Sequence, residues 1–288
     1  MKPTVFIHSN DRQMLGARIS AYSYRRNSRT PDAFDVKILS ARDHPRLTQR
    51  NQTILRAGHI RAWEPDDLQS FTPLRFYPPQ AMGFKGRAVI TDPDVFAVGD
   101  VAELFDRDLE GKAIWAVPRP GYQRQQDYIA TSVMLLDCAK LRHWRFDEQL
   151  DGLFAHRFDY IDWIELKLED RSTIGLLEAE WNDFDRLTPQ TKLLHTTKRR
   201  TQPWKTGLPV DYTLREKGWL TPALRFLSRR YQRHPDPRQE AFVYSLLAEM
   251  VDRGEVTANE LEAEMAANHI RHDSLELIER YRGMKFAA

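Results

Sequence analysis

Short apolar runs alternate with amphipathic segments along the first two thirds of the chain. Residues 4–8 form an apolar run that contains β-branched and aromatic side chains, which predicts a buried strand. Residues 13–26 carry apolar side chains at helical spacing, and residues 34–39 alternate like a second strand. This β-α-β opening predicts an α/β sheet with right-handed crossovers.

Further apolar runs continue the alternation as far as about residue 210. Strands are predicted at residues 88–91, 113–117 and 132–136, with a last short apolar piece at residues 193–195. Residues 71–84 are rich in proline and glycine and predict a short helix between turns. Residues 100–105 predict another short helix, in which Asp100 is the cap and Glu103 completes a capping box.

The pattern changes after residue 210, where helix signals follow one another without strands. Such signals start at Thr221-Pro222, at Asp236-Pro237, at Thr257, and at either Asp273 or Ser274. The first of these helices is expected to run to Arg233 and the second to end near Gly254. Glu260 is placed to form a capping box with Thr257. The chain is therefore predicted to consist of an α/β domain at residues 1–210 and a helical region at residues 211–288.

Composition limits the class of protein. Hydrophobic residues make up 41% and charged residues 29% of the 288, as is usual for a globular protein in water. The formal net charge of +2 gives no electrostatic case for nucleic acid as a partner. The single cysteine, Cys138, suits a reducing compartment. We expect a cytoplasmic protein, because the N-terminal apolar stretch is too short for a signal peptide and no run approaches a transmembrane span.

The most informative residues are Asp92-Pro93-Asp94, which directly follow the run at residues 88–91. Ligands of open α/β sheets bind beyond the carboxyl ends of the strands. Two carboxylates at that place can hold a hard divalent cation, and the cation can hold a diphosphate. The same three residues are also favourable for a solvated turn, so this pattern alone leaves both interpretations open.

Several segments between residues 3 and 207 follow one another in a specific order. They are residues 71–76, 86–95, 99–105 and 131–137, then Trp181-Asn182, Leu194-His195 and Gln202-Pro203-Trp204. Together they resemble the landmarks of family 8 glycosyltransferases, a GT-A-fold group that includes glycogenin and bacterial lipopolysaccharide galactosyltransferases. The resemblance implies a GT-A-type, Rossmann-like mixed sheet flanked by helices. It does not cover the last 80 or so residues, which are expected to form a C-terminal helical appendage.

The resemblance also implies a ligand set for a divalent cation. Asp92, Asp94 and His195 would hold Mn²⁺ or Mg²⁺, and two carboxylates with an imidazole favour Mn²⁺. A cation at this place would stabilise the departing diphosphate of a nucleotide sugar as a Lewis acid. For His195 considered alone, a core or surface histidine is the alternative.

Four further residues are implied to bind the nucleotide sugar. Arg75 would reach the phosphate or the sugar, with a surface salt bridge as the alternative. Lys198 and Lys205 follow His195 and would supply positive charge near the diphosphate, with a solvated loop as the alternative. Asn10 stands closest to the position where the family often has an aspartate that contacts uracil.

One departure from the family bears on the mechanism. The family's Asp-Gln-Asp segment is present at best as Asp162-Trp163-Ile164, and Trp163 cannot replace the glutamine chemically. Asp162 and Glu165 are the carboxylates that could act there, whereas an amphipathic helix with a buried apolar side is the alternative. Without that glutamine we favour attack on the same face from which the diphosphate departs, which retains the anomeric configuration.

The sequence therefore predicts a metal-dependent retaining glycosyltransferase that transfers a hexosyl group from a UDP-sugar to a glycan or a lipid-linked acceptor in polysaccharide biosynthesis. A catalytically degenerate sugar-nucleotide or glycan-binding protein is the alternative. A nucleotidyltransferase is disfavoured, because no glycine-rich phosphate loop follows the first strand. Peripheral contact with the inner face of an anionic membrane could come from Arg225, Arg229, Arg230 and Arg233, although nearby glutamates favour a solvated helical bundle.

Overall fold

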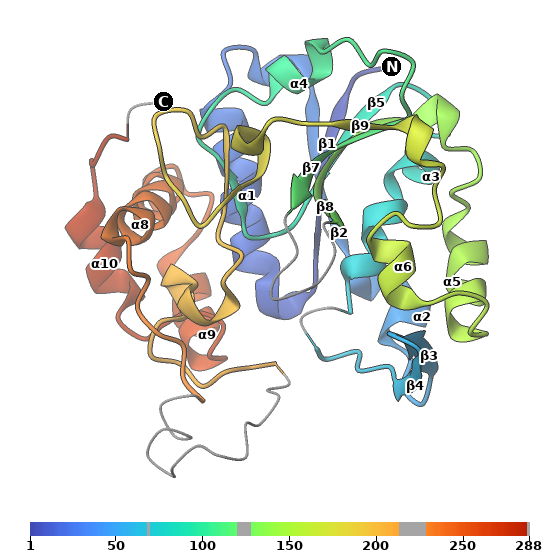
Figure 1. Cartoon of the computed structure of the whole chain (residues 1–288). Coiled ribbons are helices and arrows are strands. Elements are labelled where there is room, and N and C mark those ends of the chain that lie inside the picture. Colours follow the sequence, from blue (N-terminus) through green and yellow to red (C-terminus); the bar gives the residue numbers. More distant parts are fainter. Residues whose placement is uncertain (68–69, 120–127, 213–228, 287–288) are drawn as a thin grey trace.

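A six-stranded mixed sheet forms the centre of the molecule (Figure 1). The computed structural model of the chain describes residues 1–67, 70–119, 128–212 and 229–286. The strands of this sheet are β1 (Thr4–Ser9), β2 (Asp35–Ser40), β5 (Arg87–Thr91), β7 (Ile114–Arg119), β8 (Tyr128–Asp137) and β9 (Ile174–Leu176). Their spatial order is β2-β1-β5-β8-β7-β9. β1 runs parallel to both β2 and β5, whereas β8 runs antiparallel to its two neighbours.

Two smaller sheets are also present among the described residues. One consists of β10 (Asp183–Phe184), β11 (Leu193–His195) and β6 (Val95–Ala97), in that order. The other is a hairpin of β3 (Thr53–Arg56) and β4 (His59–Ala62). The turn of the hairpin uses Ala57 and Gly58, both with positive φ. Alanine is uncommon in that conformation, which is why the sequence pattern gave no hairpin signal there.

Helices cover both faces of the central sheet (Figure 1). Those on one side are α3 (Pro78–Ala81), α5 (Phe146–Phe154) and α6 (Tyr160–Ile164); α1 (Met14–Arg26), α8 (Pro237–Asp252), α9 (Ala258–Ala266) and α10 (Ser274–Tyr281) lie on the other. Two further short helices are α2 (Pro45–Thr48) and α4 (Ala102–Asp106). Adjacent strand residues point to opposite faces, so Val5 packs in one core and Phe6 in another. This mixed sheet flanked by helices confirms the predicted fold class.

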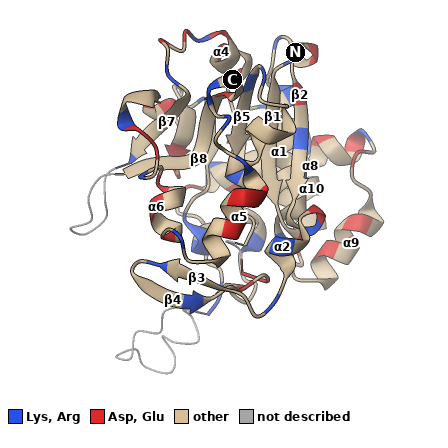
Figure 2. Ribbon diagram, turned by 90° about the vertical axis from the view of Figure 1, so that its right-hand side faces the viewer, with Lys and Arg blue, Asp and Glu red and all other residues tan. Residues whose placement is uncertain are grey.

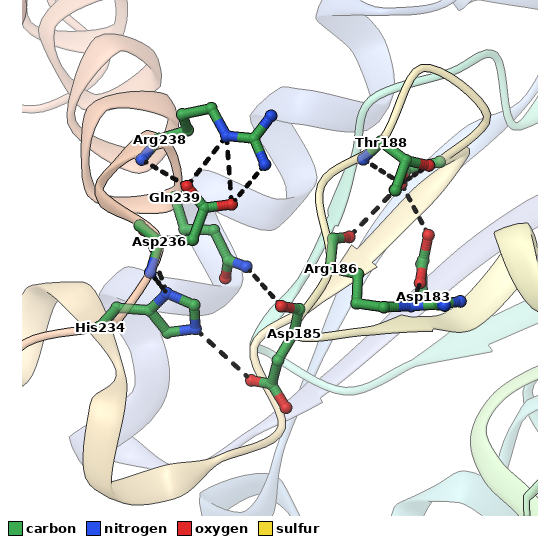
Figure 3. Close-up of polar contacts among 9 residues, drawn as sticks. Asp183, Asp185, Arg186, Thr188, His234, Asp236, Arg238 and Gln239 are labelled. Carbon is green, nitrogen blue, oxygen red and sulfur yellow. Dashed lines mark hydrogen bonds and ion pairs between the residues drawn. The ribbon is translucent and has the colours of Figure 1, made fainter.

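α1 is buried on two sides, which joins the C-terminal helices to the sheet. Ala17, Ala21 and Tyr24 pack toward the sheet, whereas Leu15 and Ile19 share a core cluster with α8–α10. Figure 3 shows a second connection near the start of α8, where Asp236 caps the helix. There, Gln239 Nε2 donates to Asp185 O at 2.9 Å. The division of the chain near residue 210 stays a prediction. Residues from before and after that point pack in the same core cluster.

The predicted helix starts have different outcomes. Thr257 and Glu260 form the predicted capping box at α9, and α10 begins at Ser274. The capping box predicted at Asp100 is wrong. The Glu103 carboxylate pairs with Lys192 Nζ at 2.8 Å instead of accepting a backbone N–H at the start of the helix. Most of the helix predicted from residue 221, with Arg225, lies outside the described residues. No helix in the described part of the chain is long and apolar enough to cross a membrane.

Candidate metal centre

Two carboxylates and an imidazole meet where β5 approaches the small sheet. β5 ends at Thr91, and the following turn carries Asp92 and Asp94 before β6 begins at Val95. In the antiparallel β6–β11 pair, His195 is the register partner of Val95. This pairing brings the imidazole beside the turn, and His195 Nε2 lies 3.4 Å from Asp94 Oδ1.

The turn is packed closely against α1. A Cβ atom built on Gly16 would lie 3.1 Å from Pro93 O, so a larger residue there would push the turn outward. One turn further along the helix, Ser20 Oγ donates to Val95 O at 2.5 Å. These two contacts with α1 therefore fix the position of the turn at the edge of the sheet.

The three predicted ligands are close enough to share one cation. One ligand atom each from Asp92, Asp94 and His195 lies within 4.8 Å of the others. With metal–oxygen distances of about 2.1 Å, two ligands on opposite sides of a small cation are roughly 4.2 Å apart, so the three side chains would have to close around a bound ion. The side chains are 15%, 13% and 5% exposed, respectively. Two carboxylates and an imidazole in this arrangement could hold a divalent cation.

Asp92 is held by two neighbouring side chains. Arg75 binds it through two hydrogen bonds, with Nε 3.0 Å from Oδ1 and Nη2 2.6 Å from Oδ2. His8, fully buried on β1, places Nε2 2.9 Å from Oδ1. Burial by itself raises the pKa of Asp92, but Arg75 and then His8 outweigh burial and hold that pKa well below its usual range. Asp92 is therefore ionised and oriented by its surroundings.

Arg75 connects the centre to α6. It lies in the 3₁₀ helix Thr72–Phe76, and its Nη1 donates to Thr131 Oγ1 at 2.8 Å. Thr131 Oγ1 donates in turn to Ile164 O, in the last residue of α6, at 2.7 Å. The Arg75 side chain is only 14% exposed, so its pair with Asp92 differs from the surface salt bridge that the sequence allowed.

His195 and Asp94 are each oriented by a buried amide. His195 Nδ1 lies 2.9 Å from Asn182 Oδ1, while Asn182 Nδ2 donates to Ser132 Oγ at 2.9 Å. Because the amide turns its oxygen to the ring, the proton is assigned to Nδ1, and Nε2 keeps the lone pair that a metal requires. Gln202 Nε2 donates to Asp94 Oδ2 at 3.0 Å, which leaves Oδ1 on the side of His195.

A small cavity of about 60 Å³ opens beside these side chains. Two of its glutamines have buried atoms with no hydrogen-bond partner among the described residues, namely Gln13 Nε2 and Gln202 Oε1. A cavity of this volume has room for more than one group of the size of water. A polar cavity with unpaired atoms suits a cation and phosphate oxygens. Its wall consists of Gln13, Phe71, Thr72, Arg75, Asp92, Pro93, Asp94, Arg199 and Gln202.

Asn10 lies outside this cavity, at the carboxyl end of β1. It lines a second hollow of about 180 Å³, together with Arg12 and with Arg42 from the loop after β2. Asn10 Oδ1 accepts a hydrogen bond from Gln13 N at 3.2 Å, and Gln13 borders the first cavity. The hollow therefore lies next to the candidate centre in the chain, at the strand edge where ligands of such sheets bind.

The two lysines predicted near the diphosphate do not border the cavity that the described residues form. The Lys198 side chain is exposed, and its backbone N–H donates to Asp185 Oδ1 at 3.1 Å. Lys205 is fully buried, with Nζ 2.7 Å from Asp211 Oδ2. Burial lowers the pKa of Lys205 against the opposing effect of Asp211. Neither lysine is placed beside the Asp92 carboxylate, and their roles stay predictions.

The two predicted catalytic carboxylates lie around the short helix α6. Asp162 and Glu165 both pair with Lys167, at 3.3 Å and 2.8 Å, and neither borders the cavity. Trp163, which the sequence resemblance matches at best to the family's glutamine, is buried and stacks on Phe76 with ring centroids 4.5 Å apart. Catalytic roles for the two carboxylates stay a prediction.

Sequence reasoning missed several residues of the centre. Asn182 and Gln202 belong to recognised landmarks, yet nothing in the sequence showed that they hydrogen-bond the ligands. His8 gave no signal, because one histidine at the end of an apolar run is compatible with any buried strand. Gln13 and Arg199 border the cavity only through the packing of distant segments, although Arg199 belongs to a basic run visible in the sequence.

Comparison with known proteins gives structural similarity without sequence similarity. No family model matches the chain, and no curated protein matches its sequence. The chain is similar in structure to the glycosyltransferase GlyE of Streptococcus pneumoniae TIGR4, with a TM-score of 0.49, 17% identity, and 82% of this chain and 66% of that one covered. It is also similar to the galactosyltransferase LgtC with donor and acceptor sugar analogs, with a TM-score of 0.45 and 13% identity, and 82% of this chain and 99% of that one covered. For the bifunctional glycosyltransferase WbbM the TM-score is 0.46 and the identity is 15%. The match covers 70% of this chain and 47% of that one, so the chain spans about half of that protein.

Proposed function

We propose that the protein is a metal-dependent retaining glycosyltransferase that uses a nucleotide-sugar donor. The observation that carries the proposal is the convergence of Asp92, Asp94 and His195 within 4.8 Å at the carboxyl edge of the sheet. A cation bound by these residues supplies Lewis-acid stabilisation to a departing diphosphate. The order of sequence landmarks that resembles family 8 supports the same class of reaction.

The protein residues around the centre have distinct tasks. Arg75 keeps Asp92 ionised and oriented, and Asn182 keeps the lone pair of His195 Nε2 directed at the ligand position. Gln202 orients Asp94. Because these contacts are present in the protein alone, the side chains need little rearrangement when charge develops on the leaving group. The ligand set favours Mn²⁺, with Mg²⁺ as the second choice.

The donor is proposed to be a UDP-sugar that spans both hollows. Its diphosphate would lie at the cavity, and its nucleoside would lie in the hollow lined by Asn10, Arg12 and Arg42. The acceptor hydroxyl would attack the anomeric carbon on the face from which the diphosphate leaves. Because attack and departure occur on the same face, the anomeric configuration is retained, and the hydroxyl proton would pass to a diphosphate oxygen. This route requires no protein nucleophile, in agreement with the buried Trp163 at the position of the family's glutamine.

The test is a screen of UDP- and GDP-sugars with Mn²⁺, in which nucleotide release is measured with and without cell glycan extracts. We expect release from at least one UDP-sugar, loss of release in Asp94→Ala, and loss in excess EDTA. Full turnover in EDTA would contradict the metal-dependent mechanism. A product of inverted anomeric configuration, seen by NMR, would contradict the retaining route alone.

A second candidate is a non-catalytic protein that binds sugar nucleotides or glycans. It is favoured by one observation, namely that Asp162 and Glu165 are both paired with Lys167 outside the cavity. Tight binding of UDP-sugars in Mn²⁺ without release of UDP from any of them, in the presence of acceptor extracts, would favour this candidate over the enzyme.

The proposed acceptor is a glycan or a lipid-linked sugar, with the protein in the cytoplasm at or near the inner face of the membrane. Figure 2 shows acidic positions along the ribbon of α9, and these residues weaken the attraction of that helix for anionic lipid. Flotation with anionic liposomes at low salt tests the contact through the C-terminal arginines. Protein left entirely in the bottom fraction would exclude such a contact.

A further inference from the structure

The charge balance of the centre calls for one more cation. Asp92 and Arg75 form an ion pair and cancel each other's charge. A divalent ion beside Asp94 then leaves a single positive charge, which is less than the negative charge of a nucleoside diphosphate. A side chain that donates charged hydrogen bonds to the remaining phosphate oxygens would restore the balance.

The basic residues considered so far are poorly placed for this task. Arg75 is occupied by Asp92 and Thr131 through three hydrogen bonds. Lys205 has no exposed surface and pairs with Asp211. Lys198 is exposed and does not line the cavity. Gln202, which does line it, is neutral and bonded to Asp94.

Arg199 has the location and the chemistry that the others lack. It lines the same cavity as Asp92, Asp94 and the unpaired Gln202 Oε1. Its guanidinium lies 5.5 Å from the centre of the Tyr212 ring, and among the described residues no carboxylate pairs with it. The residue is half-buried, so its charge is partly shielded from water.

We propose that Arg199 is the side chain that binds the diphosphate oxygens of the donor at the metal centre. The inference rests on the proposed function and names a residue of that same site. The planar guanidinium donates two parallel hydrogen bonds to phosphate, and stacking on Tyr212 limits its freedom before the ligand arrives. The backbone supports this position, because Thr201 N donates to Lys198 O at 2.8 Å and closes the turn that carries Arg199.

The experiment measures diphosphate affinity and metal affinity separately on the full-length chain. UDP and inorganic pyrophosphate are titrated calorimetrically at saturating Mn²⁺ into the wild type, Arg199→Met, Arg199→Lys, Lys198→Met and Arg142→Met. Binding of Mn²⁺ alone is followed by electron paramagnetic resonance. Arg142→Met is the matched control, since it removes an exposed arginine that lines neither hollow, and Lys198→Met tests the competing assignment of the diphosphate contact.

We expect Arg199→Met to weaken both diphosphates about tenfold to a hundredfold, which is the range for losing hydrogen bonds to a charged group. Arg199→Lys should recover part of the loss, and Arg142→Met should stay within about twofold of the wild type, as expected for an exposed charge. Mn²⁺ affinity should be unchanged or slightly higher in Arg199→Met, which shows that the centre is intact. Wild-type affinity in Arg199→Met, or an equal loss in Lys198→Met, would overturn the inference while leaving the proposed function in place. A wild type that binds neither diphosphate would overturn both, whereas binding without turnover of any sugar would remove only the enzymatic function.

Discussion

The hydrogen bond between Asn182 and His195 gives the sharpest test of how the metal centre is built. Asn182 is fully buried and bridges His195 Nδ1 and Ser132 Oγ, each at 2.9 Å. Asn182→Leu removes both contacts at nearly constant side-chain shape. It leaves the proton on His195 free to move from Nδ1 to Nε2, the atom that faces Asp94. We therefore expect weaker metal binding, although no ligand has been replaced.

The size of the effect follows from the contacts. Removing the hydrogen-bond partner of a metal-ligating histidine typically weakens metal binding about tenfold to a hundredfold, which corresponds to about 1.4–2.7 kcal/mol. Folding is also affected, because Ser132 Oγ loses a buried partner at a cost of about 1–3 kcal/mol. Asn182→Asp keeps an acceptor for Nδ1 and should recover most of the metal affinity.

The assay is Mn²⁺ binding by electron paramagnetic resonance, with urea unfolding of the same samples to measure stability. Ser132→Ala is the control, since it removes the far end of the hydrogen-bond chain but leaves Asn182 Oδ1 beside the ring. We expect at most about a threefold loss of Mn²⁺ affinity there, since the direct contact remains. Wild-type Mn²⁺ affinity in a folded Asn182→Leu protein would refute the assigned orientation of His195. So would an equal loss in Ser132→Ala.

Three further predictions concern the rest of the site. Arg75→Met should destabilise the protein by about 3–5 kcal/mol in urea unfolding, because it leaves the largely buried Asp92 carboxylate without its main partner. Combining Arg75→Met with Asp92→Leu should recover much of that loss, and a double variant as unstable as Arg75→Met would contradict the argument. The pKa of Asp92 is lowered in the folded state from its ordinary value of 3.8, so the unfolded chain binds more protons as the pH falls through that value, and stability should fall with it. Thermal unfolding from pH 5 to pH 2 should show a smaller decline in Asp92→Asn, and an unchanged decline would argue against a lowered pKa of Asp92. Asp162→Asn and Glu165→Gln should keep nucleotide release within about threefold of the wild type, since both carboxylates are surface-paired with Lys167, and a loss of a hundredfold in either would identify a catalytic carboxylate.

The sequence predicted those parts of the fold that repeat a local pattern. The strands around Val5 and Val89 and the helix beginning near Gln13 follow from hydrophobic periodicity, because each buries a regular stripe of side chains. The same periodicity cannot show that α1 is buried on two sides, since the second partner, α8, lies more than 200 residues along the chain. The hairpin at Ala57-Gly58 was missed because its turn residues are not those that usually adopt positive φ.

The sequence predicted the three candidate metal ligands, but it did not predict the residues that surround them. Asp92, Asp94 and His195 came from the order of landmarks, and their side chains do converge. The partners that orient them were not predictable, because His8 and Asn182 act through long-range contacts that leave no spacing rule in the chain. The basic residues beside the site were the hardest case. Lys205 and Arg199 lie in one basic stretch of the sequence. In the fold, Lys205 is buried and pairs with Asp211, whereas Arg199 lines the cavity.

The contacts of Asp185 show why the C-terminal helices belong in any account of the site. Its backbone N–H donates to His195 O at 2.8 Å, and its Oδ1 accepts from Lys198 N at 3.1 Å. Its carbonyl accepts from Gln239 at the start of α8, as Figure 3 shows, and burial raises the pKa of its carboxyl group. One residue thus ties the segment that carries both His195 and Arg199 to a helix beyond residue 210. Because the site needs its ligands held to within a fraction of an ångström, we infer that α8 helps to set the geometry of the metal centre.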